Sequence, residues 1–200
     1  MNDGPGLAED GNMTDEMKHG KLVYVMGPSG AGKDSLLEYA RTHCDNGLPV
    51  LFAHRYITRP AQTGGENHVA LSEAEFTRRS DSGLFALSWE SHGFHYGIGA
   101  EVISWLQRGF TVVVNGSRQY LPEAQKRIPT LAPVEIVVRP DILEQRLQSR
   151  GREDRIEIQK RLQRNGTLQS LPSDVHTIDN SGNLKTAGRE LVAFIKRQSQ

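Results

Sequence analysis

The chain has 200 residues, which favours one compact domain with a small insertion over two independent domains. It carries 24 lysines and arginines against 24 aspartates and glutamates, so the totals show no basic excess of the kind that binds nucleic acid or a membrane surface. The single cysteine excludes an intramolecular disulfide, and no apolar run approaches the roughly 18 residues of a membrane span, so we expect a soluble cytoplasmic protein.

The first 20 residues differ in character from the rest of the chain. They hold four glycines and five acidic residues, and they show no sustained apolar periodicity. We expect residues 1–20 to form a flexible acidic tail and residues 21–200 to form a single folded domain. Because the tail has a net charge of −4, the folded part carries +4, concentrated in a basic stretch at 139–164.

Short apolar, β-branched runs alternate with helical patterns along the folded part. We predict strands at 22–26, 50–53, 110–114, 134–138 and 175–178, and short antiparallel strands within 84–99. We predict helices from about residue 32, from 72, at 101–108, from 140 to a stop at Gly151, at about 153–164, and from Asn183 to the C-terminal region. This alternation is typical of the α/β class, with a parallel sheet covered on both faces.

One helix start is marked in detail. The segment Ser72-Glu73-Ala74-Glu75 fits a capping box, in which Ser72 caps the helix. Leu71 and Phe76 flank it at the two positions where a hydrophobic staple packs.

A glycine-rich turn joins the first predicted strand to the first predicted helix. Residues 27–33 fit the phosphate-binding pattern G-x-x-x-x-G-K in the strand–turn–helix context that the pattern requires. Its glycines let backbone N–H groups turn toward phosphate oxygens, and Lys33 can reach the β- and γ-phosphates of a nucleotide. The expected nucleotide-binding residues are Gly27, Pro28, Ser29, Gly30, Ala31, Gly32, Lys33, Asp34 and Ser35.

The residue after Lys33 departs from this pattern. The pattern places Ser or Thr there for the magnesium ion, but the chain has Asp34. A carboxylate can coordinate Mg²⁺, so we predict that Asp34 takes the metal role in an altered form. The alternative is a degenerate site in which Asp34 repels phosphate. The intact Lys33 and glycines favour the active site.

Beyond this turn the sequence resembles the guanylate kinase branch of the P-loop kinases. The resemblance covers most of residues 21–197 and includes Thr58-Arg59-Pro60, Gly65-Glu66, the helix start at Ser72, Gly93 to Gly97, and Arg146-Leu147 with Arg150-Gly151. It implies a three-layer α/β/α fold with a parallel core sheet. It also implies an acceptor-binding subdomain at about 53–98 and a lid at about 140–166.

The same resemblance implies roles for individual residues. Arg59 and Tyr96 fall where the family grips the phosphate of the acceptor, and His68 stands where the family has another phosphate-contacting tyrosine. Arg150 and Arg161 fall where lid arginines close over the transferring phosphoryl group. With Lys33, these two arginines are the expected catalytic residues.

Two departures bear on the acceptor. The family reads guanine partly through a glutamate just before a tryptophan, whereas here Ser88 precedes Trp89. A second family carboxylate, near the end of the third core strand, has no counterpart in Val112-Val113-Val114-Asn115-Gly116. A site without acceptors for the donors of a base loses that discrimination, so the sequence argues against GMP.

With these departures, the sequence resembles the ribose 1,5-bisphosphate phosphokinases within this family. The segments that carry the resemblance are 27–34, 54–61, 65–68, 83–89, 114–118 and 150–153. It implies Mg²⁺-assisted transfer of the γ-phosphoryl group of ATP to the 1-phosphate of ribose 1,5-bisphosphate. The products would be 5-phosphoribosyl 1-diphosphate and ADP, in phosphonate breakdown.

Arginines suit an acceptor that carries phosphates, because their planar fork grips phosphate bidentately. Arg55, Arg59 and Arg118 lie at or just beyond predicted strand ends, where open α/β sheets bind ligands. The candidate substrate-binding residues are Arg55, Arg59, His68, Ser88, Tyr96 and Arg118.

Two other functions stay open. One is a guanylate kinase or other nucleoside monophosphate kinase, which Ser88 and the missing carboxylate argue against. The other is a noncatalytic guanylate-kinase-like module that binds partner peptides; such modules lose the P-loop lysine and glycines, which this chain keeps. We expect small-molecule partners and no zinc site, and the sequence leaves the oligomeric state open.

Overall fold

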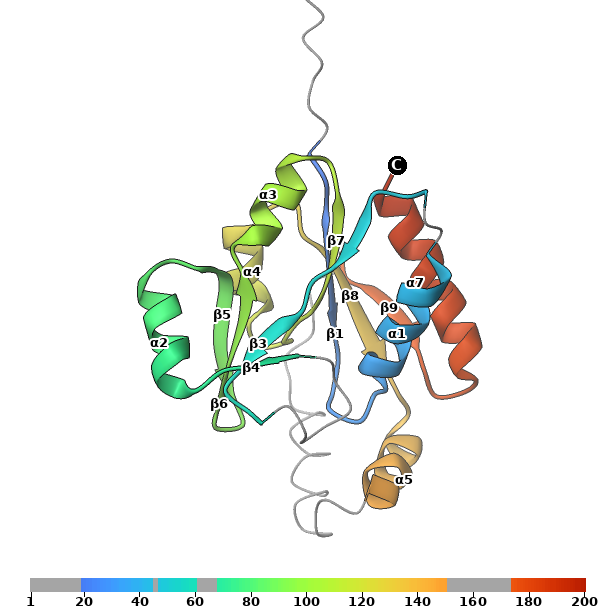
Figure 1. The fold of residues 1–200 in the computed structure, drawn as a ribbon. Helices are drawn as coiled ribbons and strands as arrows, with labels where there is room; N and C mark the ends of the chain where they lie inside the picture. The colour runs from blue at the N-terminus through green and yellow to red at the C-terminus, as the bar shows by residue number, and fades with distance from the viewer. Residues whose placement is uncertain (1–18, 45–46, 61–67, 151–173) are drawn as a thin grey trace, which may run out of the picture.

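A parallel five-stranded sheet forms the centre of the molecule (Figure 1). The computed structural model describes residues 19–44, 47–60, 68–150 and 174–200, apart from the side chain of Arg150. The sheet has the strand order β2-β7-β1-β8-β9. Its strands are β1 (Leu22–Met26), β2 (Val50–Phe52), β7 (Thr111–Asn115), β8 (Ala132–Val137) and β9 (His176–Asp179). The prediction of a parallel core sheet is confirmed.

The central strand β1 shows why both faces of this sheet are covered. All five of its side chains are buried, and they alternate between two hydrophobic clusters. Val23 and Val25 pack under α1 (Lys33–His43) and α7 (Leu184–Gln198). The other three β1 side chains pack with α3 (Glu101–Gln107) and α4 (Leu121–Arg127). The result is a three-layer α/β/α arrangement.

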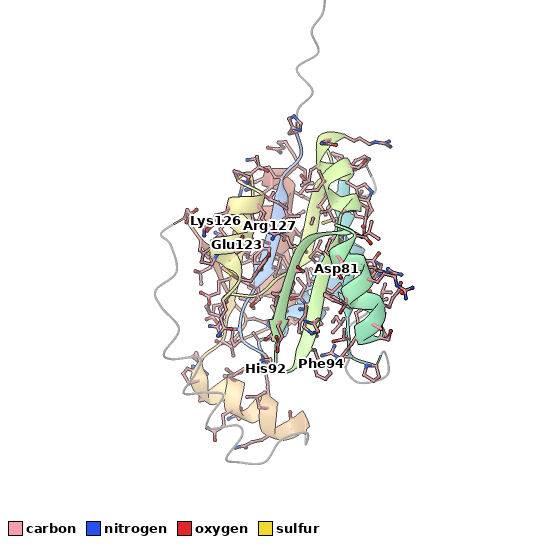
Figure 2. All side chains as sticks on the ribbon, turned by 90° about the vertical axis from the view of Figure 1, so that its left-hand side faces the viewer. Asp81, His92, Phe94, Glu123, Lys126 and Arg127 are labelled. Atoms are coloured by element: carbon pink, nitrogen blue, oxygen red, sulfur yellow. The ribbon has the colours of Figure 1, made fainter. Side chains whose placement is uncertain are left out.

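A second, smaller sheet lies beside the core on the side of α3 and α4 (Figure 1). Its strand order is β4-β3-β6-β5, and its strands are β3 (Arg55–Ile57), β4 (Val69–Ala70), β5 (Phe85–Ser91) and β6 (Phe94–Gly99). β5 and β6 form the antiparallel hairpin that the sequence predicts. Its two-residue turn, labelled at His92 in Figure 2, has positive φ at both His92 and Gly93, as a type I′ turn requires.

Helix α2 (Glu73–Asp81) covers the outer face of the smaller sheet. Its predicted cap is confirmed, because the Ser72 Oγ accepts a hydrogen bond from the backbone N–H of Glu75. The predicted cap of α7 is confirmed in the same way, since the Asn183 side chain accepts from the N–H of Lys185.

Three elements have no counterpart among the sequence predictions: β3, β4 and α4. β3 and β4 contain three and two residues, too few to show a period, and they exist because they pair with β6 and with each other. α4 has a proline in its first turn and only two buried residues, Leu121 and Ala124. Tertiary contacts rather than local pattern create these elements.

Two predictions lie outside the described residues: the acidic tail, apart from residues 19 and 20, and the helix at 153–164. Helix α5 (Pro140–Arg150) lies at the lower end of the molecule in Figure 1, below the carboxyl ends of the core strands. Among the helices that the structure describes, none is long and apolar enough to cross a membrane.

Candidate active site

The P-loop, residues 27–33, connects β1 to α1 at the carboxyl edge of the core sheet. Gly30 and Gly32 have φ angles of 95° and 83°, in the left-handed region that favours glycine. A Cβ on Gly30 would lie 2.8 Å from Leu143 Cδ1 of α5, and a Cβ on Gly32 would lie 2.6 Å from Asn180 Nδ2. Both glycines are therefore required by backbone conformation and by the close approach of neighbours.

Asn180 supports the P-loop from the end of β9, the edge strand of the core sheet. It follows β9, is 2% exposed, and donates from Nδ2 to the backbone carbonyl of Ala31 at 2.7 Å. Its own N–H donates to the carbonyl of Val137 at the end of β8. One buried residue thus ties the P-loop to the ends of β8 and β9, through its side chain to the loop and through its backbone N–H to β8.

Arg146 of α5 joins this arrangement. Its Nη2 donates to the carbonyl of Asn180 at 2.8 Å, and its Nη1 is buried without a hydrogen-bond partner among the described residues. Arg146 enters the sequence analysis only as part of the family resemblance, with no role assigned to it in the site. The structure instead places its guanidinium next to the P-loop, 3.8 Å from the position of a Cβ on Gly32.

Lys33, the first residue of α1, folds its side chain back over the loop. The Nζ donates to the carbonyls of Gly27 and Pro28, at 2.8 and 3.0 Å. The ammonium group therefore stays at the centre of the P-loop, where a phosphate chain would meet it.

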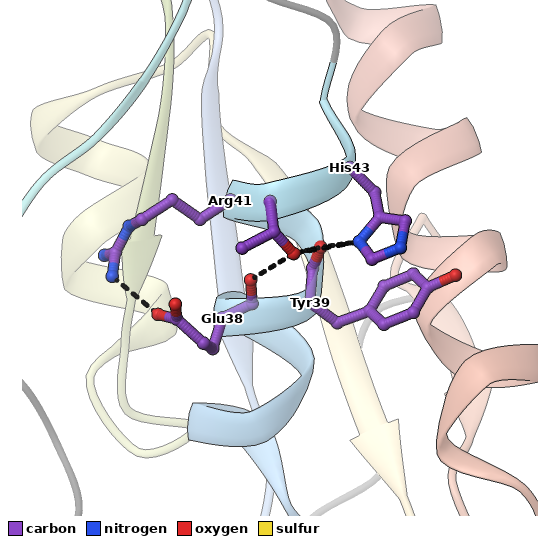
Figure 3. A network of polar contacts seen from close by, with 5 residues as sticks. Glu38, Tyr39, Arg41 and His43 are labelled. Carbon is purple, nitrogen blue, oxygen red and sulfur yellow. Dashed lines mark hydrogen bonds and ion pairs between the residues drawn. The ribbon is translucent and has the colours of Figure 1, made fainter.

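A cavity of about 470 Å³ opens beside the start of α1. Its lining residues come from α1, from the end of β2 with the start of β3, and from β7: Asp34, Ser35, Leu37, Glu38, Arg41, Phe52, Ala53, Arg55, Val113 and Asn115. At its outer end, Arg41 forms an ion pair with Glu38 at 3.0 Å, seen in Figure 3 beside the Tyr39–His43 stack. The cavity therefore runs from the P-loop outward along α1.

Asp34 stands at the head of this cavity, and the structure pairs it with a residue that sequence reasoning passed over. Asn115, the last residue of β7, donates from Nδ2 to Asp34 Oδ1 at 3.0 Å. Its position at the carboxyl end of a parallel strand is the signal that could have identified it, because ligands bind at that edge of α/β sheets.

Two of the predicted substrate-binding residues lie together in the smaller sheet. The Arg55 guanidinium lies over the Tyr96 ring, 5.1 Å from its centroid, and Tyr96 stacks on Trp89. Because Arg55 also lines the cavity, its charge is held at the junction of the two sheets. An arginine guanidinium can stack on an aromatic ring, and its planar fork suits phosphate.

Arg59 and His68 also meet. The His68 ring is buried, and its Nε2 lies 3.1 Å from the carbonyl of Arg59. Residues 61–67, which join them, lie outside the described residues. The imidazole thus holds the backbone of Arg59 in place.

Ser88 is not brought to the same place. It lies opposite Gly97 in the hairpin, whereas Trp89 lies opposite Tyr96. Side chains alternate between the faces of a strand, so Ser88 belongs to the face that carries α2 and not to the face of Tyr96 and Arg55.

Arg118 lies beyond β7, in an ion pair with Glu135 of β8 at 3.5 Å. Both side chains are about 15% exposed. Burial lowers the pKa of Arg118, and the neighbouring carboxylate of Glu135 opposes that shift. The guanidinium is therefore engaged by a carboxylate of the protein itself, on β8.

The two expected lid residues cannot be placed. Arg161 lies outside the described residues, and Arg150 ends α5 with its side chain outside them.

The chain is similar to curated proteins over nearly its whole length. It is 49% identical over 179 residues to the ribose 1,5-bisphosphate phosphokinase PhnN of Thiobacillus denitrificans, covering 90% of this chain and 94% of that protein. It is 55% identical over 175 residues to the protein of the same name from Desulfomicrobium baculatum, covering 88% and 94%. No family model matches the chain.

Among solved structures, guanylate kinase from Anaplasma phagocytophilum superposes with a TM-score of 0.65 at 15% identity, over 92% of this chain and 88% of that one. This likeness confirms the guanylate-kinase-like P-loop fold. Together with the identity to curated relatives, it shows that the chain belongs to the ribose 1,5-bisphosphate phosphokinase family.

Proposed function

We propose that this protein transfers the γ-phosphoryl group of ATP to the 1-phosphate of ribose 1,5-bisphosphate, giving 5-phosphoribosyl 1-diphosphate and ADP, in phosphonate catabolism. The observation that carries the proposal is the cavity that leads from Asp34 and Ser35 at the P-loop to Arg55 of the smaller sheet. It brings a donor site and an arginine suited to a phosphorylated acceptor into one space. The curated relatives bear the name of this activity.

The reaction needs position and charge neutralisation rather than a general base. An oxygen of the 1-phosphate is already anionic, and it attacks the γ-phosphorus as the bond to the β–γ bridging oxygen breaks. The electron pair of that bond leaves on ADP, and no proton is transferred. The protein must hold two polyanions in line, with Lys33 at the donor and Arg55 and Arg59 at the acceptor.

The residues at the head of the cavity fit the magnesium ion that accompanies ATP. Mg²⁺ prefers oxygen ligands and binds through one or two carboxylates together with nucleotide phosphates. Asp34 offers such a carboxylate directly after the P-loop lysine, and Asn115 Nδ2 keeps it in place. When bound, the ion neutralises charge on the phosphate oxygens.

We assign the acceptor to the smaller sheet, within residues 53–98, and closure over the phosphoryl group to the lid at about 140–166. Arg150 and Arg161 remain the predicted lid arginines, and Arg118 remains a predicted acceptor contact. Ser88 lies on the opposite face of the hairpin from Tyr96 and Arg55, so we do not assign it to the acceptor. A cytoplasmic location remains a prediction from the single cysteine.

The proposal is tested by measuring ADP release with ribose 1,5-bisphosphate, GMP and ribose 5-phosphate as separate acceptors, with the product identified by ³¹P NMR. We expect ADP release only with ribose 1,5-bisphosphate, together with the ³¹P signals of the diphosphate group of 5-phosphoribosyl 1-diphosphate. Turnover with GMP and with neither of the other acceptors would overturn the assignment of ribose 1,5-bisphosphate as the substrate. β7 lines the cavity with Val113 and Asn115 and brings no carboxylate to it, which supports the expected rejection of GMP.

A further inference from the structure

We propose that Asn115 is a positioning residue for phosphoryl transfer, which aims the Asp34 carboxylate at the magnesium ion of the nucleotide and offers its own amide oxygen to that hydrated ion. The inference rests on the proposed function. It names a second residue of the metal site, on a different element from Asp34.

The contact between the two side chains spans two elements. Asn115 ends β7 and is 5% exposed, while Asp34 lies in the first turn of α1. Asn115 Nδ2 lies 3.0 Å from Asp34 Oδ1, and both residues line the cavity. A buried side chain therefore supports an exposed carboxylate at the point where the donor and acceptor must meet.

The charge of Asp34 fixes how the amide of Asn115 is turned. An ionised carboxylate can only accept hydrogen bonds, so the NH₂ group of the amide must face it. The amide oxygen then points away from Asp34. In the structure this oxygen, Oδ1, is buried and has no hydrogen-bond partner among the described residues.

An acceptor buried in this way needs a donor, because a buried polar atom left unpaired is costly. The water shell of Mg²⁺ supplies such donors, since the ion keeps several waters when it binds a nucleotide. One amide can thus serve the site twice, by donating to the carboxylate that meets the ion and by accepting from a water on that ion.

The topology places Asn115 where such a role is expected. In P-loop NTPases generally, the loop supplies a hydroxyl and a strand supplies an aspartate to the metal. Here β7 is the strand paired with β1, the strand that leads into the P-loop. In this chain the carboxylate, Asp34, follows the loop, and the neutral side chain, Asn115, ends the strand. Relative to the general arrangement, the acidic and the neutral residue have therefore exchanged places.

The competing explanation is a structural hydrogen bond that only ties α1 to β7. The test therefore measures metal binding and not activity alone. Mn²⁺ binding in the presence of ADP is followed by electron paramagnetic resonance for wild type and Asn115→Ala. We expect the Mn²⁺ affinity of the variant to fall about tenfold, because removing a group that orients a metal ligand typically costs 10- to 100-fold.

Thr111→Val is the matched control. Thr111 is buried on the same strand, at the opposite end, and its hydroxyl donates to the carbonyl of Gln198. This variant also loses a buried hydrogen bond, so we expect a lower melting temperature with wild-type Mn²⁺ affinity. If Asn115→Ala behaved in the same way, the positioning role would be overturned.

A double variant tests the exchange of places. Asp34→Ser alone should lose Mn²⁺ affinity, and Asp34→Ser with Asn115→Asp should recover at least half of the loss on a logarithmic scale, because it restores a hydroxyl on the loop and a carboxylate on the strand. No recovery would contradict the proposed role. The Mn²⁺ measurement does not involve the acceptor, so turnover with GMP alone would overturn the proposed substrate and leave the assignment of Asn115 standing.

Discussion

The proposed donor side and the proposed acceptor side of the active site are built in opposite ways. The donor side is one contiguous loop, residues 27–33, and distant groups such as Asn180 and Leu143 only support it. The proposed acceptor side has no contiguous core: the cavity that leads to it takes a few residues each from α1, the β2–β3 connection and β7. The functional residues of a contiguous loop can be identified from a sequence pattern, whereas those of an assembled cavity come together only in the folded structure.

The largest expected effect is on the donor side. Lys33→Ala removes the ammonium group from the centre of the P-loop, and we expect kcat to fall about 10³-fold, as when a donor to a transition-state oxygen is lost. Coupled measurement of ADP release gives the rate. The control is Lys21→Ala, just before β1 at the opposite end of that strand, where the exposed Nζ donates to Gln198 Oε1 at the surface. Equal activity in the two variants would remove Lys33 from the donor site.

A second change separates backbone strain from steric conflict at the P-loop. Gly32→Ala puts a Cβ at a φ of 83° and 2.6 Å from Asn180, and we expect a loss of about 3 kcal/mol in the free energy of unfolding. Gly83→Ala has a φ of 70° with no atom within 4 Å of the new Cβ, so it should cost only about 1 kcal/mol. Chemical denaturation measures both. Equal losses of unfolding free energy in the two variants would mean that Asn180 does not limit the space at position 32.

A third change compares the two asparagines that flank the P-loop. Asn180→Ala breaks the hydrogen bond to Ala31, and we expect the KM for ATP to rise about tenfold, equivalent to about 1.4 kcal/mol of lost binding, with Mn²⁺ affinity in the ADP complex less affected. Asn115→Ala should show the reverse pattern, because it touches Asp34 and not the loop. Initial rates at varied ATP and saturating Mg²⁺ give the comparison. The same KM change in both variants would contradict the separation of nucleotide binding at Asn180 from metal binding at Asn115.

The predictive power of the sequence follows the same division. The core strands, the caps of α2 and α7 and the P-loop could be predicted, because each depends on residues close together in the chain. The pairing of Asn115 with Asp34 spans 81 positions, and that of Asn180 with Ala31 spans 149. No local pattern contains such contacts.

The candidate acceptor residues show the same limit within one short hairpin. Ser88 and Trp89 are neighbours in the sequence, but they lie on opposite faces of the smaller sheet. Matching motifs by the tryptophan alone could not decide which residue faces the cavity side. The register of β5 against β6 decides it, and that register becomes visible only when the strands are paired.

The smallest effect is expected at Tyr24, which supports the turn after β7. Its hydroxyl donates to the carbonyl of Ser117 and accepts from the N–H of Ser117, and burial raises the pKa of Tyr24 well above its ordinary value of 10.0. Below pH 10 both the folded and the unfolded states keep the proton, so the free energy of unfolding receives no pH dependence from this group. Above pH 10 the unfolded state releases the proton and the folded state retains it, so the free energy of unfolding falls by about 1.4 kcal/mol per pH unit.

Tyr24→Phe should cost about 1 kcal/mol at pH 7 by leaving the backbone of Ser117 unpaired, and it should remove this contribution to the alkaline slope. Urea denaturation at pH 7 to 11 measures both quantities. An unchanged slope in the phenylalanine variant would mean that Tyr24 does not carry the alkaline loss of stability.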